Sequence, residues 1–592
     1  MIKVSIITPV YNSADVIGET ILSVLKQAYK EWEMIIVDDG SADAISEVVD
    51  EYVKKDGRIK FFRQDNAGAS AARNTGIKHA NYEWLLFLDA DDWIHENYFE
   101  NMIRALEQDP SIDVVHCGWT RVQKNGSMSK EVYGGEEIDM FPALSYYSPF
   151  AIHSCIVRKK LVEDVGGFDT SFKTCVDWDL WQRVARTGAR FFMVKETMAF
   201  YRTRAYSLSS NVHQFCLNGL QVISNAYVAD PRVPQPNPDY ANGLKADDLI
   251  TRMYHFVIWC AGVLIGQGKE ASGLLEHLKN KTAEHLDGNL AGQILTDSLI
   301  IPAEKEQNSW HIHWQMIEDN LKCFLSDLEQ QTYSTSIADK TCAVIEHHVI
   351  LQSAAHIKQQ QVGKSFAVQI DLESPIPGIE MPVDAERFIG IVWLQEKILD
   401  LIELPVTDRF LAATIIKNAV ATKLSWQILY YFFLKNVYPF HQQTCQLKLT
   451  EEIHDKIGWE FFLQELWNKP LWTNKIFYDP HADRKEKALK MEADDEIFIE
   501  ISEALPSIKT RSSELKIHYF VGGVHAGIAL CRPNGRSVTP QMIRAAITLA
   551  GGYELCRLVV RESVVGQKLD NGFSLLERLK IAREKTLPQA FD

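Results

Sequence analysis

Short apolar segments alternate with helical patterns in the N-terminal part of this 592-residue chain. Each segment has the length and composition of a buried strand, and the stretch after it carries apolar residues at helical spacing. The four segments are Lys3–Thr8, Met34–Val37, Ile59–Phe62 and Trp84–Leu88. Strands that alternate with helices in this way form a parallel sheet with right-handed crossovers. The sequence therefore predicts an α/β fold with a Rossmann-like, mostly parallel sheet.

Polar side chains gather after these predicted strands. They are Asn12, Asp38, Asp39, Arg73, Asp89 and Asp91. Because the carboxyl ends of parallel strands border the ligand crevice of such a sheet, we expect a nucleotide to bind there. No Gly-x-Gly-x-x-Gly follows the first strand and no Gly-Lys-Ser/Thr phosphate loop occurs, which argues against a nicotinamide enzyme and a P-loop NTPase.

A cluster of carboxylates ends the fourth predicted strand, in the run Phe87-Leu88-Asp89-Ala90-Asp91-Asp92-Trp93. Three such charges repel one another unless a cation lies nearby. Hard divalent cations take oxygen ligands and leave coordination positions for phosphate, so a cation that holds a phosphate ester is the functional interpretation. The structural alternative is that Asp91 or Asp92 caps a helix starting near Glu96.

Six motifs carry a family resemblance. In order, they are SIITPVYNSADVIGETILSVLKQ, MIIVDDGSAD, DNAGASAARNTGIKHA, WLLFLDADDW, VGGFDTSFKTCVDWDLWQRVARTG and FYRTRAYSLSSN. Together they resemble glycosyltransferase family 2, whose members have the GT-A fold, over a little more than a third of the chain. The resemblance implies transfer of a sugar from a nucleotide-diphospho-sugar, by default a UDP-sugar. It also implies inversion at the anomeric carbon and Mn²⁺ or Mg²⁺ as cofactor.

The resemblance assigns a nucleotide pocket residue by residue. Asp39 is similar to the family's base-recognising carboxylate, and Pro9, Tyr11 and Asn12 line the same pocket. The alternative for the Asp38–Ser41 segment is a solvated turn, because Asp, Gly and Ser favour turns.

Three further residues complete the donor site that the resemblance implies. Arg73 approaches the nucleotide or its phosphates, and its alternative is an ordinary exposed arginine on a helix. Asp89 and Asp91 form the DXD pair, in which Asp91 is the better metal ligand and Asp89 lies near the ribose and the metal. Asp92 is a less certain third member.

The general base is implied by the run Val176-Asp177-Trp178-Asp179-Leu180-Trp181. Asp177 aligns with the Asp of the family's Glu-Asp pair and would take the proton of the acceptor hydroxyl. Val176 replaces the Glu, which puts the acceptor contacts of that Glu in doubt. Asp179 does not share a helix face with Asp177, so we expect it to pair with Arg183. The structural alternative for Asp177 is a helix cap.

The segment Tyr201–Arg204 also departs from the family pattern, because many relatives carry a His in place of Arg204. An arginine stays protonated and cannot ligate a metal, but it can clamp phosphate oxygens. The sequence leaves open whether Arg204 or the nearby His213 replaces that histidine.

Composition limits the partners and the cellular compartment that we expect for the protein. With 62 basic against 78 acidic side chains the net charge is −16, which argues against a nucleic-acid partner. Ten cysteines without paired spacing and the lack of a signal peptide favour the cytoplasm. The apolar segment Phe256–Ile265 is about half as long as a bilayer span, and the Gln-x-x-Arg-Trp motif of processive synthases is missing. We therefore expect a non-processive enzyme.

Several partners stay open at this point. The acceptor is a carbohydrate, a lipid-linked sugar or a protein, and a lipid-linked acceptor would place the enzyme at the inner face of the membrane. Peripheral membrane association and a homo-oligomer are both compatible with the sequence.

The proline-rich segment Asp230–Pro238 predicts a domain boundary. We expect a GT-A domain over 1–228, a helical domain over 243–360 and an α+β region of unknown role over 361–592. In the last two regions the pattern predicts helices at Leu249–Ile265, Trp314–Leu328 and Phe388–Leu404, a strand at Ser365–Leu372 and a hairpin around Gly522-Gly523.

Two other function classes remain. The departures at Val176 and Arg204 allow a catalytically degenerate transferase that acts as a binding or scaffold protein. Against it, a scaffold would not require Asp39, Asp89 and Asp177 together. A nucleotidyltransferase shares the fold type but needs a glycine-rich basic first loop, which this chain does not have.

Overall fold

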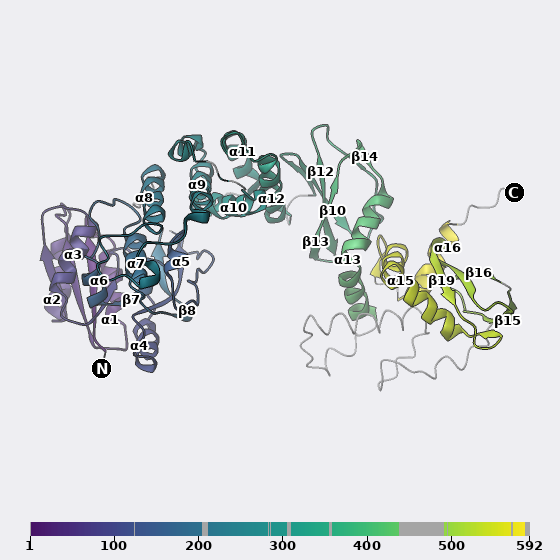
Figure 1. Ribbon diagram of the computed structural model, residues 1–592, viewed down its shortest axis with the longest axis horizontal. Coiled ribbons are helices and arrows are strands. Elements are labelled where there is room, and N and C mark those ends of the chain that lie inside the picture. The colour runs from purple at the N-terminus through teal and green to yellow at the C-terminus, as the bar shows by residue number, and fades with distance from the viewer. Residues whose placement is uncertain are drawn as a thin grey trace. The chain divides into compact units, whose positions relative to one another are not determined.

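The computed structural model describes residues 2–123, 125–203, 211–281, 283, 286–304, 310–354, 358–436, 490–493, 495–569 and 572–586. They divide into two compact units, Met1–Ile345 and Glu346–Asp592. Figure 1 shows the first unit in purple to teal and the second in green to yellow. The three segments 1–228, 243–360 and 361–592 stay a prediction.

An eight-stranded sheet organises the first unit, in the order β3-β2-β1-β4-β7-β6-β8-β5. Strands β1 to β4 are all parallel, β6 is parallel to β8, and β7 and β5 run antiparallel to their neighbours. The strands are β1 Val4–Val10, β2 Trp32–Asp38, β3 Ile59–Arg63, β4 Trp84–Phe87, β5 Trp93–Ile94, β6 Val114–Val122, β7 Cys155–Arg158 and β8 Phe191–Arg202. The four strands predicted from apolar runs and the α/β fold are confirmed.

Helices cover both faces of this sheet. On one face α1 (Ile17–Leu25), α2 (Ile45–Lys55) and α4 (Tyr98–Gln108) share a core with β1, β2 and β4. On the other face α3 (Ala69–His79) lies close to β1, because a Cβ at Gly76 would stand 2.4 Å from the Cγ2 of Ile7. A glycine at this position lets the helix approach the strand.

Four further helical elements complete the sheet domain. These are α5 Phe141–Leu144, η1 Ile152–Ser154, α6 Lys159–Asp164 and α7 Val176–Arg186. Phe168, which precedes α7, packs edge-on against Phe87 of β4 with ring centroids 4.9 Å apart. This contact holds the loop that precedes α7 against β4.

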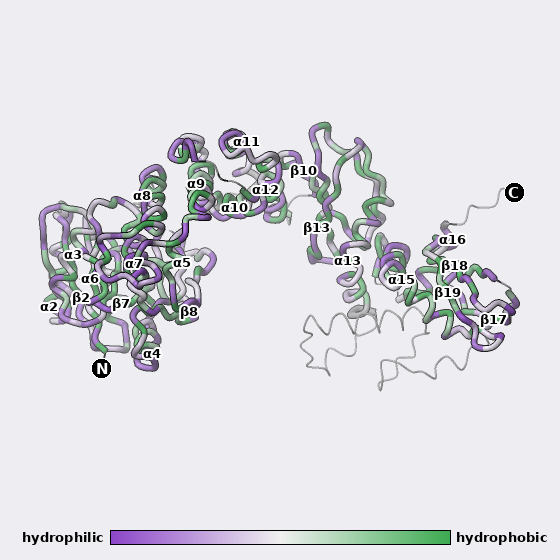
Figure 2. Tube along the Cα trace, in the orientation of Figure 1, coloured by the Kyte–Doolittle hydropathy of each residue, from purple (hydrophilic) through white to green (hydrophobic). Residues whose placement is uncertain are grey.

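A helical region follows the sheet domain. It comprises α8 Val212–Asn225, α9 Leu249–Gly266, α10 Gly288–Glu304, α11 Trp310–Thr332 and α12 Ile337–Ser353. The helices predicted at Leu249–Ile265 and Trp314–Leu328 are confirmed. Among the described residues, the segment Ala246–Gly266 is long and apolar enough to cross a membrane by length and composition, with a mean hydropathy of 1.5 (Figure 2). It is also 67% buried, and a core helix passes the same test.

The second unit combines small sheets with long helices. Its first part holds β9 Gln359–Val362, β10 Ser365–Asp371, β11 Ile379–Glu380, β12 Arg387–Leu394, β13 Lys397–Pro405, β14 Phe410–Leu411 and α13 Ala413–Asn436. Its second part holds β15 Lys490–Glu492, β16 Glu496–Glu500, β17 Ser507–Lys509, β18 Leu515–Val521, β19 Val524–Cys531, β20 Ser537–Val538, α15 Pro540–Ser563 and α16 Leu575–Thr586.

The strand predicted at Ser365–Leu372 and the hairpin around Gly522-Gly523 are confirmed. The helix predicted over Phe388–Leu404 is wrong, because this segment forms the antiparallel hairpin of β12 and β13. Side chains on both faces of β12 are buried, so the strand reads as one continuous apolar run. Such a run does not distinguish a doubly buried strand from a buried helix.

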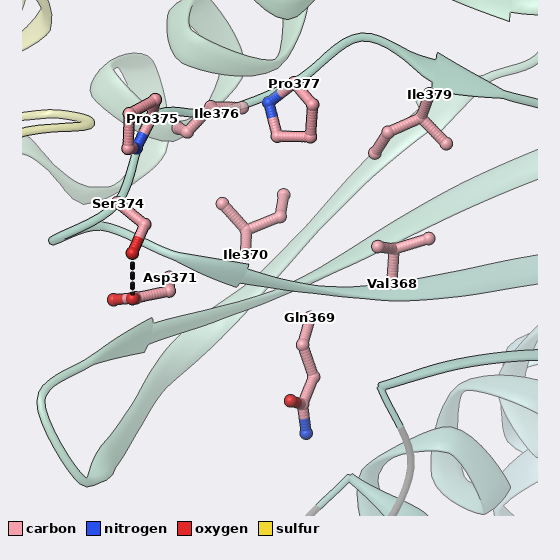
Figure 3. A pocket seen from close by; sticks show the side chains of 9 residues that line it. All are labelled: Val368, Gln369, Ile370, Asp371, Ser374, Pro375, Ile376, Pro377 and Ile379. Carbon is pink, nitrogen blue, oxygen red and sulfur yellow. Dashed lines mark hydrogen bonds between the residues drawn. The ribbon is translucent and has the colours of Figure 1, made fainter.

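A pocket of about 180 Å³ lies beside β10 in this unit (Figure 3). The proline-containing segment from Ser374 to Ile379 forms one wall of it. The Ser374 hydroxyl donates to the Asp371 carboxylate over 2.6 Å, so the two polar side chains at its end bond to each other. Figure 3 also shows Gln369 on the opposite side of β10 from Val368 and Ile370.

Candidate active site

The loop after β1 is bonded to the loop after β2. Asn12 adopts a left-handed φ of 48°, its amide donates to the Ser41 hydroxyl over 2.9 Å, and its side-chain oxygen accepts from the Ala42 amide over 2.8 Å. Pro9 is buried in β1, whereas Tyr11 is 53% exposed. These three predicted pocket residues therefore lie together at the carboxyl end of β1.

Asp39 is buried at the end of β2, and its carboxylate is heavily hydrogen-bonded. It accepts from the Gln64 side chain over 2.7 Å and from the Ala67 and Gly68 amides over 2.9 and 2.8 Å. A carboxylate offers about four acceptor positions, so one is left for a further donor such as a base N–H. Sequence reasoning missed Gln64, which lies outside the turn motif and is oriented by the Thr75 hydroxyl.

Arg73 lies on α3, and only 4% of it is exposed, so it is not the exposed helix arginine of the structural alternative. One guanidinium nitrogen contacts the Asp89 carboxylate at 2.5 Å, whereas Nε and Nη1 are buried without a hydrogen-bond partner. Buried donors are nearly always bonded, and an unmet one costs about 1–3 kcal/mol. This guanidinium therefore presents two donors suited to the oxygens of an anionic ligand.

The Asp89–Asp92 loop is fixed from two sides. The Thr20 hydroxyl of α1 lies 2.8 Å from the carbonyls of Ala90 and Asp92. Arg202 of β8 donates from Nε to the Asp91 carbonyl over 2.8 Å, pairs with Glu19 and lies over the Trp93 ring. Both Asp89 and Asp91 keep partial exposure.

Asp92 is buried and faces inward. One carboxyl oxygen accepts from the Arg202 amide over 2.8 Å, and the other lies 3.2 Å from Nδ1 of the buried His153. Burial, with Asp91 and Asp89 adding to it, raises the pKa of Asp92 well above its usual range, and burial lowers the pKa of His153 to about 4. The helix-cap alternative is wrong, because α4 begins at Tyr98.

Asp177 lies in the first turn of α7, two residues after Cys175, whose φ of 57° is left-handed. A strained residue of this kind costs about 1–3 kcal/mol and such residues cluster at functional sites. Burial raises the pKa of Asp177; the Trp178 amide and the Arg73 guanidinium oppose this rise, and the Asp89 charge adds to it. The charges of Arg73 and Asp89 therefore act on the Asp177 carboxyl, which stays partly exposed to solvent.

The loop before α7 is attached to α3 through Asn74. The Asn74 side chain donates to the Phe168 carbonyl over 2.8 Å and accepts from the Phe168 amide over 2.9 Å. A Cβ at Gly167, where φ is 69°, would stand 2.6 Å from the Asn74 oxygen. Neighbouring residues of one helix thus hold Asp89 on one side and the start of the Asp177 helix on the other.

Asp179 forms ion pairs with two arginines and has a structural role. It is buried, it accepts from Arg183 over 3.0 and 2.7 Å, and its other oxygen contacts Arg232 at 3.0 Å. The expected pair with Arg183 is present. Arg204 lies outside the described residues, and His213 is exposed in the first turn of α8.

No group of three or more His, Cys, Asp or Glu side chains arranged for a metal occurs within the described ranges. Magnesium-type sites on nucleotides commonly use one or two protein carboxylates together with substrate phosphates. The partly exposed Asp89 and Asp91 fit such a sparse donor set, whereas the buried Asp92 is already engaged with His153.

Comparison with known proteins identifies the family. The family profile "Glycosyl transferase family 2" matches residues 5–166. The putative teichuronic acid biosynthesis glycosyltransferase TuaG of Bacillus subtilis (strain 168) is 31% identical over 211 residues, which cover 82% of that protein and 35% of this chain. The chain belongs to glycosyltransferase family 2. The family match includes the residues from Pro9 to Asp91 that the resemblance assigned, and it ends before Asp177.

The matches to three Rickettsia relatives cover smaller shares of those proteins. An uncharacterized glycosyltransferase of Rickettsia felis (strain ATCC VR-1525 / URRWXCal2) is 34% identical over 245 residues, which are 41% of this chain and 40% of that protein. Among the first three relatives, this chain spans between 30% and 60% of their length. The solved structure of S. aureus TarS 1–349 has 18% identity, a TM-score of 0.33, and a match that covers 62% of this chain and 96% of TarS.

Proposed function

We propose that this protein is an inverting, metal-dependent, non-processive glycosyltransferase that moves a sugar from a nucleotide-diphospho-sugar to a hydroxyl group of an acceptor. The observation that carries the proposal is the buried Arg73 guanidinium, which bonds to Asp89 and has two unbonded donors. A diphosphate supplies the acceptor oxygens that these donors lack. Membership of glycosyltransferase family 2 and the printed function of TuaG support a role in polysaccharide or glycoconjugate synthesis.

The reaction is a single displacement. The acceptor oxygen forms a bond to the anomeric carbon, its proton passes to the Asp177 carboxylate, and the bond to the nucleoside diphosphate breaks. The raised pKa of Asp177 supports this role, because a carboxylate with a raised pKa binds the proton more strongly at the operating pH. Its partial exposure leaves room for the acceptor hydroxyl.

The departing diphosphate carries negative charge that must be balanced locally. Arg73 would donate from Nε and Nη1 to its oxygens while its third nitrogen stays on Asp89. Asp91 and Asp89 would hold Mn²⁺ or Mg²⁺, which offsets charge on the leaving group when bound. Arg204 is proposed as a second phosphate clamp and His213 as its alternative.

The nucleoside would lie over the ends of β1 and β2. Asp39 retains about one acceptor position for a base N–H, and the exposed Tyr11 offers a ring surface beside Pro9 and Asn12. A UDP-sugar is the default donor. The acceptor is a carbohydrate, a lipid-linked sugar or a protein, and the location is cytoplasmic, at the inner membrane face for a lipid-linked acceptor.

Calorimetry with UDP, GDP, dTDP and CDP, each with and without Mn²⁺, tests the donor part of this proposal. One nucleotide should bind only in the presence of the metal. The Arg73→Leu variant should lose this binding, whereas Arg190→Leu, on an exposed residue of the same protein, should retain it. A chain that binds none of the four nucleotides under any condition would support the scaffold alternative.

A further inference from the structure

The second unit repeats one arrangement twice. Each copy begins with a strand, a short strand and a second long strand that is parallel to the first. A tight turn then leads to an antiparallel strand, and another short strand and a 24-residue helix complete the copy. The first copy comprises β10, β11, β12, β13, β14 and α13; the second comprises β16, β17, β18, β19, β20 and α15. The short strands pair with each other in both copies, and both hairpins contain a bulge.

The two copies align through their hairpin turns. When Gln395-Glu396 is placed on Gly522-Gly523, Ile391 becomes equivalent to His518 and Leu401 to Ile528. Ile391 pairs with Gln369 across β10, and His518 pairs with Phe498 across β16, so these two partners are equivalent as well. The remaining side of each sheet contributes to one core shared with α13 and α15.

A helix covers the outer side of the sheet in the first copy. The Ser365 hydroxyl and Arg387 both bond to Glu346 of α12, over 2.6 and 2.7 Å. At the other end of the contact, the Gln369 amide donates to the Ala354 carbonyl over 2.7 Å. The apolar residues between these bonds, Ala367, Ile389, Ile391 and Leu401, are at most 1% exposed.

Within the part of the chain that the structure describes, the equivalent side of the second copy is exposed. Phe498 is 65% exposed, Leu530 56% and Ile528 50%. Phe498 stacks on His518 with ring centroids 4.8 Å apart, and Phe520 lies edge-on to His525 at 5.1 Å. We call these six residues the open face. A contiguous exposed apolar patch of this kind marks an interaction site more often than chance exposure does.

We propose that the open face joins two copies of this chain face to face about a two-fold axis. Such an interface requires a surface that complements itself. Glu496 and Lys516 lie 3.3 Å apart at the edge of the open face, so a two-fold axis can bring the Glu496 of one copy to the partner's Lys516 and the reverse. The apolar side chains beside these charges would then be buried against the partner, as their equivalents are buried in the first copy.

The size of the open face sets the strength of the contact. Three strands about 4.8 Å apart and about seven residues long, with a rise of about 3.3 Å, give a footprint of roughly 14 by 23 Å. An interface of this size falls below the roughly 1,200 Å² of total buried surface that stable complexes reach. The contact should therefore be weak, so that the dimer exchanges with the monomer.

Sedimentation equilibrium of the full chain tests the proposal. Between about 1 and 100 μM, a range that brackets micromolar affinity, the apparent mass should rise from 67.4 kDa towards twice that value. Phe498→Asp and Ile528→Asp should each remain at 67.4 kDa, whereas Leu549→Asp, on an 88% exposed residue of α15, should dimerise like the wild type. All three residues are at least half exposed, so the variants should fold.

Charge reversal provides a second readout. Glu496→Lys and Lys516→Glu should each weaken the dimer at least tenfold, and the double reversal should restore it. A wild-type chain that stays at 67.4 kDa throughout the range would overturn the proposal, as would equal dimerisation of Phe498→Asp and Leu549→Asp. Nucleotide binding, measured on the same variants, should be unchanged, which separates this result from the test of the transferase function.

Discussion

The substitution Asp177→Asn tests the proposed chemistry most directly. Asn keeps the size of the side chain and an oxygen that can accept from the Trp178 amide, which Asp177 does over 2.9 Å. It removes the group that takes the proton. General-base catalysis contributes about 10²- to 10⁴-fold to a rate, so kcat should fall by that factor, or about 2.7–5.4 kcal/mol in activation free energy.

Donor affinity should change little in the same variant. Asp177 interacts favourably with Arg73 and unfavourably with Asp89, so removing its charge takes away effects of opposite sign near the diphosphate site. Release of nucleoside diphosphate, followed with saturating donor and acceptor, reports kcat, and calorimetry reports the dissociation constant. Turnover within threefold of the wild-type value would refute Asp177 as the base.

The pH dependence adds an independent check on Asp177. Because its pKa is raised in the folded state, the wild-type rate should rise with pH through a value above the ordinary 3.8, and this limb should vanish in Asp177→Asn. The same shift means that the ionised carboxylate costs folding free energy above that pKa. Asp177→Asn should therefore raise Tm at neutral pH while it lowers kcat.

Three further substitutions probe the neighbouring roles. Asp91→Ala should weaken donor binding only in the presence of Mn²⁺, and an identical metal titration by calorimetry would contradict its ligand role. Arg73→Lys keeps the charge but not the planar fork, so donor affinity should fall about tenfold or more; unchanged affinity would argue against direct contact with the phosphates. Asp179→Ala leaves the buried Arg183 without its carboxylate, whereas Arg232 keeps Asp169 and Asp230. The variant should cost about 3–5 kcal/mol in urea unfolding, and a loss below 1 kcal/mol would contradict a structural ion pair.

The local sequence pattern was sufficient to predict the parallel strands of the sheet and the polar loops at their carboxyl ends. Strands β1 to β4 are short apolar runs separated by helical spacing, so the parallel sheet and its shared carboxyl edge follow from the sequence alone, whereas the strand order does not. The pair of Asp179 with Arg183 was predictable for the same reason, because both residues lie on one face of one helix.

Contacts between distant segments could not be predicted. His153 has no motif around it, and its position beside Asp92 depends on how η1 packs under the loop after β4. Gln64 lies beside Asp39 because β3 pairs with β2 in a register that places Arg63 opposite Asp38, and the apolar pattern does not specify this register. The β12–β13 hairpin was mistaken for a helix because α12 and α13 bury both its faces, and this removes the alternation that normally reveals a strand.

Helix α3 fixes the position of Asp89 relative to the loop that precedes α7. Arg73 and Asn74 are consecutive, so their side chains leave the helix about 100° apart, one towards Asp89 and the other towards the Phe168 loop. Inserting or deleting one residue before this pair would turn both side chains by that angle and break both contacts. Length variation among relatives should therefore fall in the loops that flank α3, and the helix itself should keep its register even where acceptors differ.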